Sequence, residues 1–380
     1  MKHYMKRIAV LLVAALLIGY LSPAAREARA ETTMVGDFEL DGTTLVKYHG
    51  TAENVKVPDE VTTIGYNAFK NNTTMKSLYL GKNVTSIENY IVEGCTALTT
   101  IGIPEGDTEV ELGYSAFYGA NALTTVQIDA RVRSINREFL DIRTLTEFVV
   151  DENNVNYFSE DGVLYYREGT NNYTLLRMPR NSSVTDYVMP GNPQVKNIDA
   201  GAFSECDNLI TVRISDYVET IRREAFSSCS KLTDVVMGKN VSAIESNIFS
   251  WCYELSGLTL SEKLTPETSD VYFVEDYLST LYVPAGCGYV PPGAWDSDRL
   301  TNIVVEEGNK KYFSDNGVLY GYDEEGNQKL LAYPRAKEAE NYKILDGTKI
   351  IGDHAFYYAR KLKNIEMPDS LETIENYAFY

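Results

Sequence analysis

A short pattern of apolar residues recurs along this 380-residue chain and constrains its fold more than any other feature. The pattern is Leu or Met, two residues, an apolar residue, any residue and a second apolar residue, as in Leu209-Ile-Thr-Val212-Arg-Ile214. The alternating apolar residues predict a short strand in each copy. Most steps between copies are 22 to 25 residues, and the copies begin at Met75, Leu98, Leu123, Leu145, Leu209, Leu232, Leu255, Leu278, Leu300 and Leu362.

Each unit has a second half. A short extended piece ends in Ile, as in Val218-Glu-Thr-Ile221, and an Ala-Phe pair such as Ala225-Phe226 follows it. We expect a strand at the Ile piece and a single helical or 3₁₀ turn at the Ala-Phe pair. One unit of about 23 residues cannot bury its own apolar face, whereas stacked units cover one another. The sequence therefore predicts a β-rich repeat solenoid with a continuous apolar core.

A longer duplication interrupts this array. Residues 156–165 (NYFSEDGVLY) match residues 311–320 (KYFSDNGVLY), and both stretches run on to Leu-Leu-x-x-Pro-Arg. Asp161-Gly162 and Asn316-Gly317 are dipeptides typical of hairpin turns. We expect β-hairpins embedded near residues 156–180 and 311–335, and a related N-terminal capping hairpin within residues 31–52. The solenoid then spans residues 53–380.

The first 30 residues have the features of a secretory signal peptide. Basic residues at Lys2, Lys6 and Arg7 precede an apolar run over 8–21, and Ala28-Arg29-Ala30 resembles a cleavage site. The alternative is an uncleaved N-terminal anchor. No second apolar stretch is long enough to cross a membrane. We therefore expect a mature chain without a transmembrane segment, either secreted or on the cell surface.

The repeat units resemble the BspA-type leucine-rich repeats of bacterial surface and secreted proteins. Residues 198–214 (IDAGAFSECDNLITVRI) are the clearest copy, and the resemblance covers roughly residues 38–380. It implies a leucine-rich repeat solenoid used for adhesion or macromolecular binding outside the cell, without catalytic residues. The chain departs from the pattern at Ile91-Val92, Ile248-Phe249, the irregular residues 266–274, and a Gly/Pro-rich loop over 281–300 that carries Trp295.

Candidate chemistry in the sequence is sparse. The mature chain retains only His49 and His354, and neither lies in a nucleophile motif. Cys95, Cys206, Cys229 and Cys252 follow the Ala-Phe position by three residues, so neighbours should stack as small buried residues, with a disulfide as the alternative. The acidic loops 151–154 and 306–309 are read as solvated turns, with Ca²⁺ binding as the alternative. We expect no enzyme activity, no metal and no cofactor.

The candidate binding residues lie on two surfaces. Outward-facing strand positions form one surface, which is mostly small and polar. Tyrosines of the two hairpins form the other, and their alternative role is to pack each hairpin against the solenoid. The strand-face candidates are Tyr79, Gln127, Arg213, Tyr282 and Glu366, and the hairpin candidates are Tyr157, Tyr165, Tyr312 and Tyr320.

These observations favour a binding or adhesion module for an extracellular protein or glycan. The net charge of −19 argues against a nucleic-acid partner, because phosphate binding needs a basic surface. We expect a monomer. Two alternatives are a structural spacer that displays a C-terminal domain absent from this chain, and an extracellular glycan hydrolase. The array stops at Tyr380 inside a repeat, which predicts further repeats, an anchor or another domain beyond it.

Overall fold

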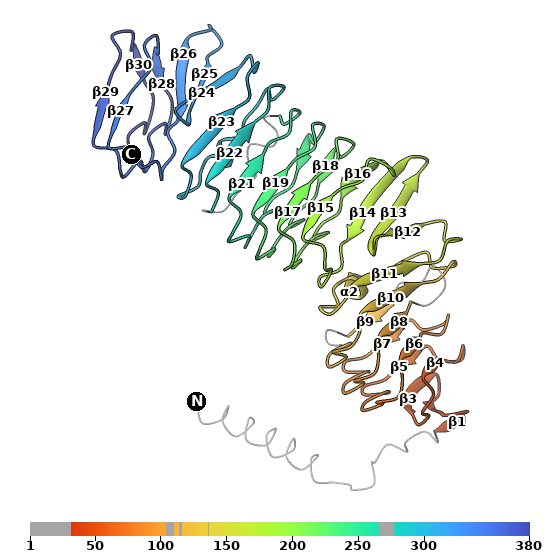
Figure 1. Ribbon diagram of the computed structural model, residues 1–380. Helices are drawn as coiled ribbons and strands as arrows, with labels where there is room; N and C mark the ends of the chain where they lie inside the picture. The colour runs from red at the N-terminus through yellow and green to blue at the C-terminus, as the bar shows by residue number, and fades with distance from the viewer. Residues whose placement is uncertain (1–31, 104–109, 114–115, 136, 266–276) are drawn as a thin grey trace, which may run out of the picture.

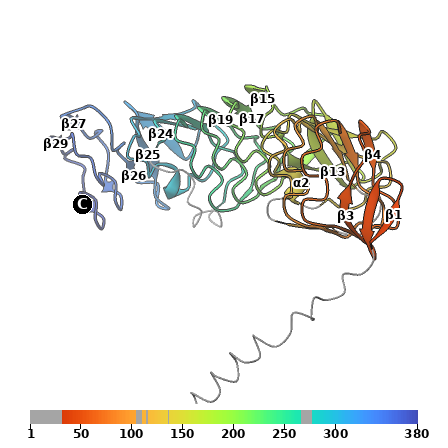
Figure 2. The same ribbon diagram turned by 90° about the horizontal axis from the view of Figure 1, so that it is seen from below.

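A computed structural model describes residues 32–103, 110–113, 116–135, 137–265 and 277–380. The predicted signal peptide (1–30) and the irregular segment 266–274 lie outside these ranges. The rest forms an elongated, curved stack of short strands, with β1 near one end and β29 and β30 at the other (Figure 1). Seen from below, the turns follow one another along a single long axis (Figure 2). The predicted repeat solenoid is confirmed.

The recurring Leu-x-x-apolar-x-apolar pattern forms parallel ladders along one side of the stack. Its two apolar side chains point inward and are buried, as Val212 and Ile214 are, while the intervening residue faces solvent. These strands are β4 (Asn54–Lys56), β6 (Ser77–Tyr79), β8 (Thr100–Gly102), β10 (Thr125–Ile128) and β11 (Glu147–Val150), and then β15 (Asp186–Val188), β17 (Thr211–Arg213), β19 (Asp234–Val236), β21 (Gly257–Thr259), β22 (Thr280–Val283) and β23 (Asn302–Val305).

The extended pieces, most of which end in Ile, form a second set of ladders. Neighbouring strands are parallel and in register, as in the pairing of Ile198 with Ile221 and of Ile221 with Ile244. The strands are β3 (Thr44–Tyr48), β5 (Thr63–Ile64), β7 (Ser86–Ile87) and β9 (Glu111–Leu112), then β16 (Val195–Ile198), β18 (Thr220–Ile221) and β20 (Ala243–Ile244), and finally β28 (Ile350–Ile351) and β30 (Thr373–Ile374).

The Ala-Phe segments are series of tight turns. The amide of Ala68 donates to the Gly65 carbonyl and that of Lys70 to the Asn67 carbonyl, which is the i to i+3 spacing of a 3₁₀ turn. Asn67 and Asn71 both have φ of 61°, and this left-handed conformation stops the turn from continuing as a helix. In the part of the chain that the structure describes, the helical segments are α2 (Arg137–Leu140) and η2 (Pro292–Ala294).

The two duplicated segments fold in the same way. Each is a three-stranded antiparallel meander whose last strand joins the ladder of Ile pieces, β14 pairing with β16 and β26 with β28. The first meander is β12 (Tyr157–Glu160), β13 (Val163–Gly169) and β14 (Asn172–Arg177), and the second is β24 (Tyr312–Asp315), β25 (Val318–Tyr322) and β26 (Gln328–Ala332).

A third antiparallel set lies at the N-terminal end of the described residues. Here β1 (Thr33–Val35) pairs with β2 (Phe38–Asp41), and β2 pairs with β3. Because β3 pairs in parallel with β5, these strands continue the ladder of Ile pieces.

The apolar core of the described residues is divided into three segments, whereas we had expected a continuous core. Each meander sends alternate side chains into different parts of the core: Leu164 packs into the segment before it, and Val163 and Tyr165 into the segment after it. The second meander repeats this division. Side chains of a strand alternate between its faces, so an inserted meander separates one core segment from the next while contributing to both.

The last two strands formed by the Leu-x-x-apolar-x-apolar pattern are β27 (Asn341–Lys343) and β29 (Asn364–Glu366). They pair in parallel beyond the second meander. Within the described ranges, no helix is long and apolar enough to cross a membrane.

Candidate functional site: the strand face

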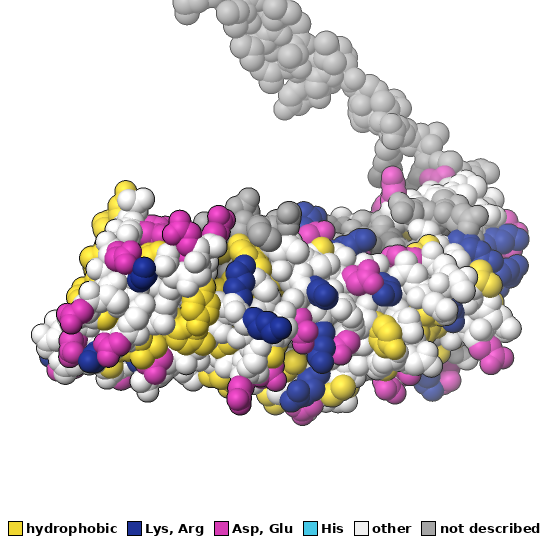
Figure 3. Space-filling view, turned by 90° about the horizontal axis from the view of Figure 1, so that it is seen from above, with side chains coloured by type: hydrophobic (Ala, Val, Ile, Leu, Met, Phe, Trp, Pro, Cys, Tyr) yellow, Lys and Arg dark blue, Asp and Glu magenta, His cyan; other side chains and the backbone are white. Residues whose placement is uncertain are grey.

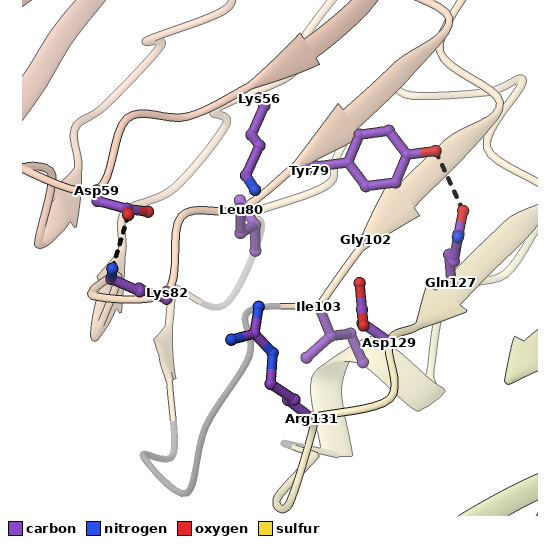
Figure 4. A pocket seen from close by; sticks show the side chains of 10 residues that line it. All are labelled: Lys56, Asp59, Tyr79, Leu80, Lys82, Gly102, Ile103, Gln127, Asp129 and Arg131. Carbon is purple, nitrogen blue, oxygen red and sulfur yellow. Dashed lines mark hydrogen bonds and ion pairs between the residues drawn. The ribbon is translucent and has the colours of Figure 1, made fainter. Parts of the chain in front are cut away.

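Two of the strand-face candidates, Tyr79 and Gln127, lie together. The Tyr79 hydroxyl donates to Gln127 Oε1 at 3.1 Å, although the residues are 48 positions apart in sequence (Figure 4). The register places Tyr79 of β6 beside Gly102 of β8, and Gly102 beside Gln127 of β10. The phenol therefore reaches across one whole turn of the solenoid.

Gly102 makes this reach possible. A Cβ atom at this position would lie 2.5 Å from Cδ1 of Tyr79, so any other residue would push the ring away. The sequence shows the same alignment, because Tyr79, Gly102 and Gln127 occupy the same position in three successive repeats.

A hollow of about 220 Å³ opens beside this pair (Figure 4). Its wall includes Lys56, Lys82 and Arg131 together with Asp59 and Asp129. Lys82 Nζ lies 2.8 Å from Asp59 Oδ2, and this hydrogen bond lowers the pKa of Asp59 below its ordinary value. The hollow offers paired charges and a phenol–amide pair, which are groups suited to recognition through hydrogen bonds.

Arg213 and Tyr282 lie in one row across the sheet that runs from β15 to β23. The strand register runs from Val188 through Arg213, Val236, Thr259 and Tyr282 to Val304. We call these six residues the outer row. Val188 is 65% exposed, Tyr282 40% and Val304 36%, so apolar surface faces solvent at intervals along the row.

A second outward row runs beside the outer row. Thr211 donates to Asp186 Oδ1 at 2.7 Å on the neighbouring strand. Asp234 lies across Gly257, where a Cβ atom would be 2.2 Å from Oδ2 of Asp234. Partial burial raises the pKa of Asp234, an effect that the nearby Arg213 opposes. Glycines on both sheets thus let side chains of the preceding turn lie flat on the strand face.

The fifth strand-face candidate, Glu366, lies apart from the others. It belongs to the two-stranded sheet of β27 and β29, where its carboxylate lies 3.2 Å from Lys343 Nζ. The strand face is therefore divided into three sheets, because a meander stands between β11 and β15 and another between β23 and β27. Only within each sheet do the candidate residues share a surface.

The hairpin tyrosines are buried. Tyr165 and Tyr320 are 1% and 0% exposed, and each hydroxyl bonds to a tyrosine of the following turn, Tyr187 at 2.8 Å and Tyr342 at 2.6 Å. Tyr157 and Tyr312 are 6% and 8% exposed. Burial raises the pKa of Tyr157 and of Tyr165 to about 12. Their placement matches the alternative role, packing of each meander against the solenoid.

The five cysteines are buried and free of disulfides. The thiols of Cys95, Cys229 and Cys252 donate to the carbonyl oxygens of Phe69, Phe203 and Phe226 in the preceding turn, at 3.1, 3.0 and 3.0 Å. Burial raises the pKa of Cys95 to about 11 and that of Cys206 to about 12. These thiols stack as small core residues, so the disulfide alternative does not describe them.

The acidic loops contribute backbone contacts between turns. Asn154 and Asn309 each donate from the side-chain amide to two carbonyls of the preceding turn and accept from two backbone amides of their own loop. His49 and His354 are partly exposed and lie 2.8 and 2.9 Å from Glu39 and Asp353. Within the described residues, no group of three His, Cys, Asp or Glu side chains could hold a metal ion.

Sequence reasoning missed Val188 of the outer row. Its repeat unit begins with Val184 where the pattern has Leu or Met, so the search for that pattern passed over β15 (Asp186–Val188). A looser search that accepts Val or Ala at the first position would have found it.

The face seen from above in Figure 3 has hydrophobic side chains gathered toward the C-terminal half, with acidic and basic side chains interspersed around them.

The chain matches one protein-family model. The BspA type Leucine rich repeat region model matches residues 46–163, 180–313 and 332–380, in six copies. The gaps in the match, 164–179 and 314–331, fall on the two meanders. None of the curated proteins compared with the chain matches it.

Solved structures of leucine-rich repeat proteins also match the chain. A leucine rich cell surface protein from Faecalibacterium prausnitzii is 20% identical with a TM-score of 0.40, and the match covers 72% of this chain and 94% of that one. A leucine-rich repeat protein from Eubacterium ventriosum is 19% identical with a TM-score of 0.42, covering 88% and 87%. The pneumococcal vaccine antigen PcpA is 15% identical with a TM-score of 0.38, covering 90% and 95%.

Proposed function

The chain belongs to the BspA-type leucine-rich repeat family, and we propose that it acts outside the cell as a binding or adhesion module for an extracellular protein or glycan. It holds its ligand on the strand face and does not transform it. The outer row is the observation that carries this proposal, because exposed valines, a tyrosine and an arginine follow one another there on adjacent strands.

The chemistry of the outer row favours a protein partner for this face. Neighbouring strands lie about 4.8 Å apart, so a row of six residues spans roughly 24 Å. Tyrosine and arginine are enriched at protein interfaces, and exposed apolar side chains add surface that a partner can bury. Strand backbones hold these side chains at fixed spacing, which reduces the entropy lost on binding.

Export supports the same proposal. The basic start, short apolar run and Ala-Arg-Ala sequence of residues 1–30 are the features of a signal peptide. Cell fractionation tests export directly: we expect the mature chain in the medium or on the cell surface, and a chain lacking residues 2–30 inside the cell. Equal distribution of both forms would contradict export.

An array of immobilised extracellular proteins and glycans tests binding. We expect the purified wild-type protein to bind at least one immobilised protein, and the Arg213→Ala and Tyr282→Ala variants to bind it at least about tenfold more weakly, as interface arginines and tyrosines often do. Tyr118→Ala is the matched control, because Tyr118 is 64% exposed but lies outside the strand face. Absence of any binding would contradict the module, and unchanged binding by both variants would exclude the outer row.

A further inference from the structure

The two meander units can be compared position by position, because they are copies with one register. In the first, Leu164 pairs with Arg177, and in the second Leu319 pairs with Ala332, with a register shift at the same place. The preceding strands repeat as well: Thr125 pairs with Glu147, and Thr280 with Asn302. Each residue of the first unit therefore corresponds to the residue 155 positions later.

In the first unit, an arginine side chain fills the space between the meander and the loop before it. Arg177 is only 3% exposed. Its guanidinium donates to the carbonyls of Leu140 and Gly201, and Nη2 lies 3.1 Å from Asp141 Oδ1. Arg180 also lies near Asp141, at 3.6 Å. The loop, the meander and the following turn are thus joined by one buried cation.

The second unit lacks this arginine. Ala332 stands at the position of Arg177, and Trp295 stands at the position of Leu140. The ion pair next to it is kept, since Arg335 contacts Asp296 and lies 3.0 Å from Asp298. Ala332 and Trp295 both line a groove of about 830 Å³ between the Gly/Pro-rich loop, β25 and β26, and the turn after β28. Its volume is typical of a ligand site.

Aromatic rings line the groove from several elements. Tyr289 and Trp295 come from the Gly/Pro-rich loop, Tyr322 from the end of β25 and Tyr357 from the following turn. Tyr322 is 47% exposed and the other three rings are partly exposed. Aromatic faces of this kind can stack against the C–H faces of a flat apolar group.

Some of the charged side chains that line the groove form ion pairs, and others do not. Lys329 Nζ lies 2.7 Å from both carboxylate oxygens of Glu375, and the guanidinium of Arg335 lies 4.9 Å from the centre of the Tyr357 ring. Five carboxylates and three lysines or arginines line the groove in total. An anionic ligand would meet excess negative charge, whereas a neutral ligand with hydroxyl donors would satisfy carboxylate acceptors.

One buried polar group at the groove has no partner in the described structure. Tyr333 is 4% exposed, and its hydroxyl makes no hydrogen bond to the residues that the structure describes. Tyr333 lines the groove and replaces Met178 of the first unit, which has no such group. An unsatisfied buried hydroxyl is unfavourable, so Tyr333 is a further difference between the two units at the wall of the groove.

We propose that this groove binds a short neutral oligosaccharide, with sugar rings stacked on Trp295 and Tyr322 and sugar hydroxyls bonded to the paired carboxylates and cations. A proline-rich peptide also stacks on aromatic rings. Such a peptide offers mainly carbonyl acceptors, so it would leave the carboxylates without donors. A sugar hydroxyl both donates and accepts, which matches both members of each ion pair. The site is distinct from the outer row and does not depend on it.

Fluorescence and calorimetric titration test the groove. The chain has two tryptophans, so Trp251→Phe leaves Trp295 as the single reporter. We would titrate this protein with the neutral tetrasaccharides of cellulose, starch, chitin and β-1,4-mannan, with an oligogalacturonate as the anionic probe and with a decaproline peptide. The expected result is saturable binding of at least one neutral tetrasaccharide, with a change in Trp295 fluorescence and no binding of the anionic probe.

Two variants locate the binding. Ala332→Arg introduces the arginine that the first unit has at the corresponding position, and its side chain fills the groove. Trp295→Leu introduces the leucine that the first unit has at the position of Trp295, and its binding is measured by calorimetry because the fluorescent reporter is lost. Each should weaken binding at least about tenfold, while Tyr118→Ala, an exposed tyrosine outside both the groove and the strand face, should leave it unchanged. Far-ultraviolet circular dichroism measures whether each variant is folded. If Ala332→Arg does not fold, Trp295→Leu alone tests the site. No neutral binding, binding of the peptide alone, or binding unchanged by a folded variant would overturn the proposal.

Discussion

Single residues decide how the strand face is shaped. Gly102 lets the Tyr79 ring lie across a neighbouring turn and reach Gln127, and Gly257 does the same for Asp234. A periodic pattern gives no reason to expect these contacts, because the repeat fixes only the inward positions. The outward positions are free to vary, and small residues there determine which side chains of the preceding turn lie flat.

The Gly102→Val substitution tests this role. The new side chain would displace the Tyr79 ring, and we expect loss of the Tyr79–Gln127 hydrogen bond with a decrease of about 1 kcal/mol in the free energy of unfolding. Chemical denaturation measures the change. Thr100→Val, on the same strand and also facing outward, is the matched control and should cost less. Equal stability of Gly102→Val and wild type would show that the bond contributes nothing.

The buried cysteines should be unreactive in the folded protein. Burial raises the pKa of Cys95 to about 11 and that of Cys206 to about 12, so almost no thiolate is present at neutral pH. A disulfide reagent such as dithionitrobenzoate should label none of the five thiols until denaturant is added. Ser246→Cys, at an exposed position, should be labelled at once. Rapid labelling of wild type before unfolding would contradict the buried placement.

At the scale of elements, the turns are joined by side chains that bond to the backbone of the preceding turn. Asn309 Nδ2 donates to the carbonyls of Pro284 and Cys287 at 2.8 and 3.0 Å, and its Oδ1 accepts from the amides of Lys311 and Tyr312. One asparagine thus fixes the approach to the second meander. Asn154 makes the corresponding bonds before the first.

We expect Asn309→Ala to lower the free energy of unfolding by about 1 to 3 kcal/mol, because it leaves several backbone groups without partners. Lys310→Ala, an exposed neighbour, should change it by less than about 0.5 kcal/mol. Thermal and urea unfolding measure both. If the two variants were equally stable, the contacts of Asn309 would not hold the turns together.

The meander tyrosines give the fold a dependence on alkaline pH. Folding raises the pKa of Tyr165 from 10.0 to about 12, so the folded state keeps this phenol neutral while the unfolded state ionises it. Its contribution to stability is therefore complete below about pH 10 and is lost as the pH rises from about 10 to 12. Tyrosinate absorbance and circular dichroism should show late ionisation together with unfolding.

The control for this prediction is Tyr282→Phe, which removes an exposed phenol and should leave the alkaline transition unchanged. Tyr165→Phe removes the buried one, and we expect its stability to fall less steeply over the same pH range. Titration of every tyrosine near pH 10 with an intact fold would contradict the prediction.

Particular elements show how far the sequence alone was informative. The pattern at Leu209–Ile214 correctly predicted β17, and Val218–Ile221 correctly predicted β18. It missed β4, β15 and β27, whose units begin with Ala52, Val184 and Ala339. The strands form although Ala52 is exposed and Val184 and Ala339 are only partly buried, so a search that demanded Leu or Met was too strict.

The Tyr79–Gln127 contact and the groove could not be predicted from the sequence in the same way. Tyr79 and Gln127 could be placed in one column, but their contact depends on side-chain rotation over Gly102. The groove depends on the absence of an arginine side chain, because the second meander has Ala332 where the first has Arg177. Comparing the two copies by their offset of 155 residues exposes that difference, yet only the structure shows which surfaces it opens.

At the scale of the whole molecule, the two meanders divide a long stack into three core segments that share strands. Repeat proteins are stabilised mainly by contacts between neighbouring units. Here Leu164 and Tyr165 belong to different segments although they are adjacent in sequence. The meanders therefore interrupt the strand face and contribute side chains to the core segments on both sides, which sets the boundaries of each proposed binding surface.

Both proposed surfaces depend on one arrangement: residues about one repeat apart lie side by side on adjacent strands. Disulfide trapping measures this most directly. In register, Arg213 faces Val236, at about 4.8 Å, and Thr259 lies one strand further, at roughly 9.6 Å. We predict that the pair Arg213→Cys and Val236→Cys cross-links rapidly on oxidation and that Arg213→Cys with Thr259→Cys does not. Cross-linking of the second pair but not the first would contradict the stacked solenoid.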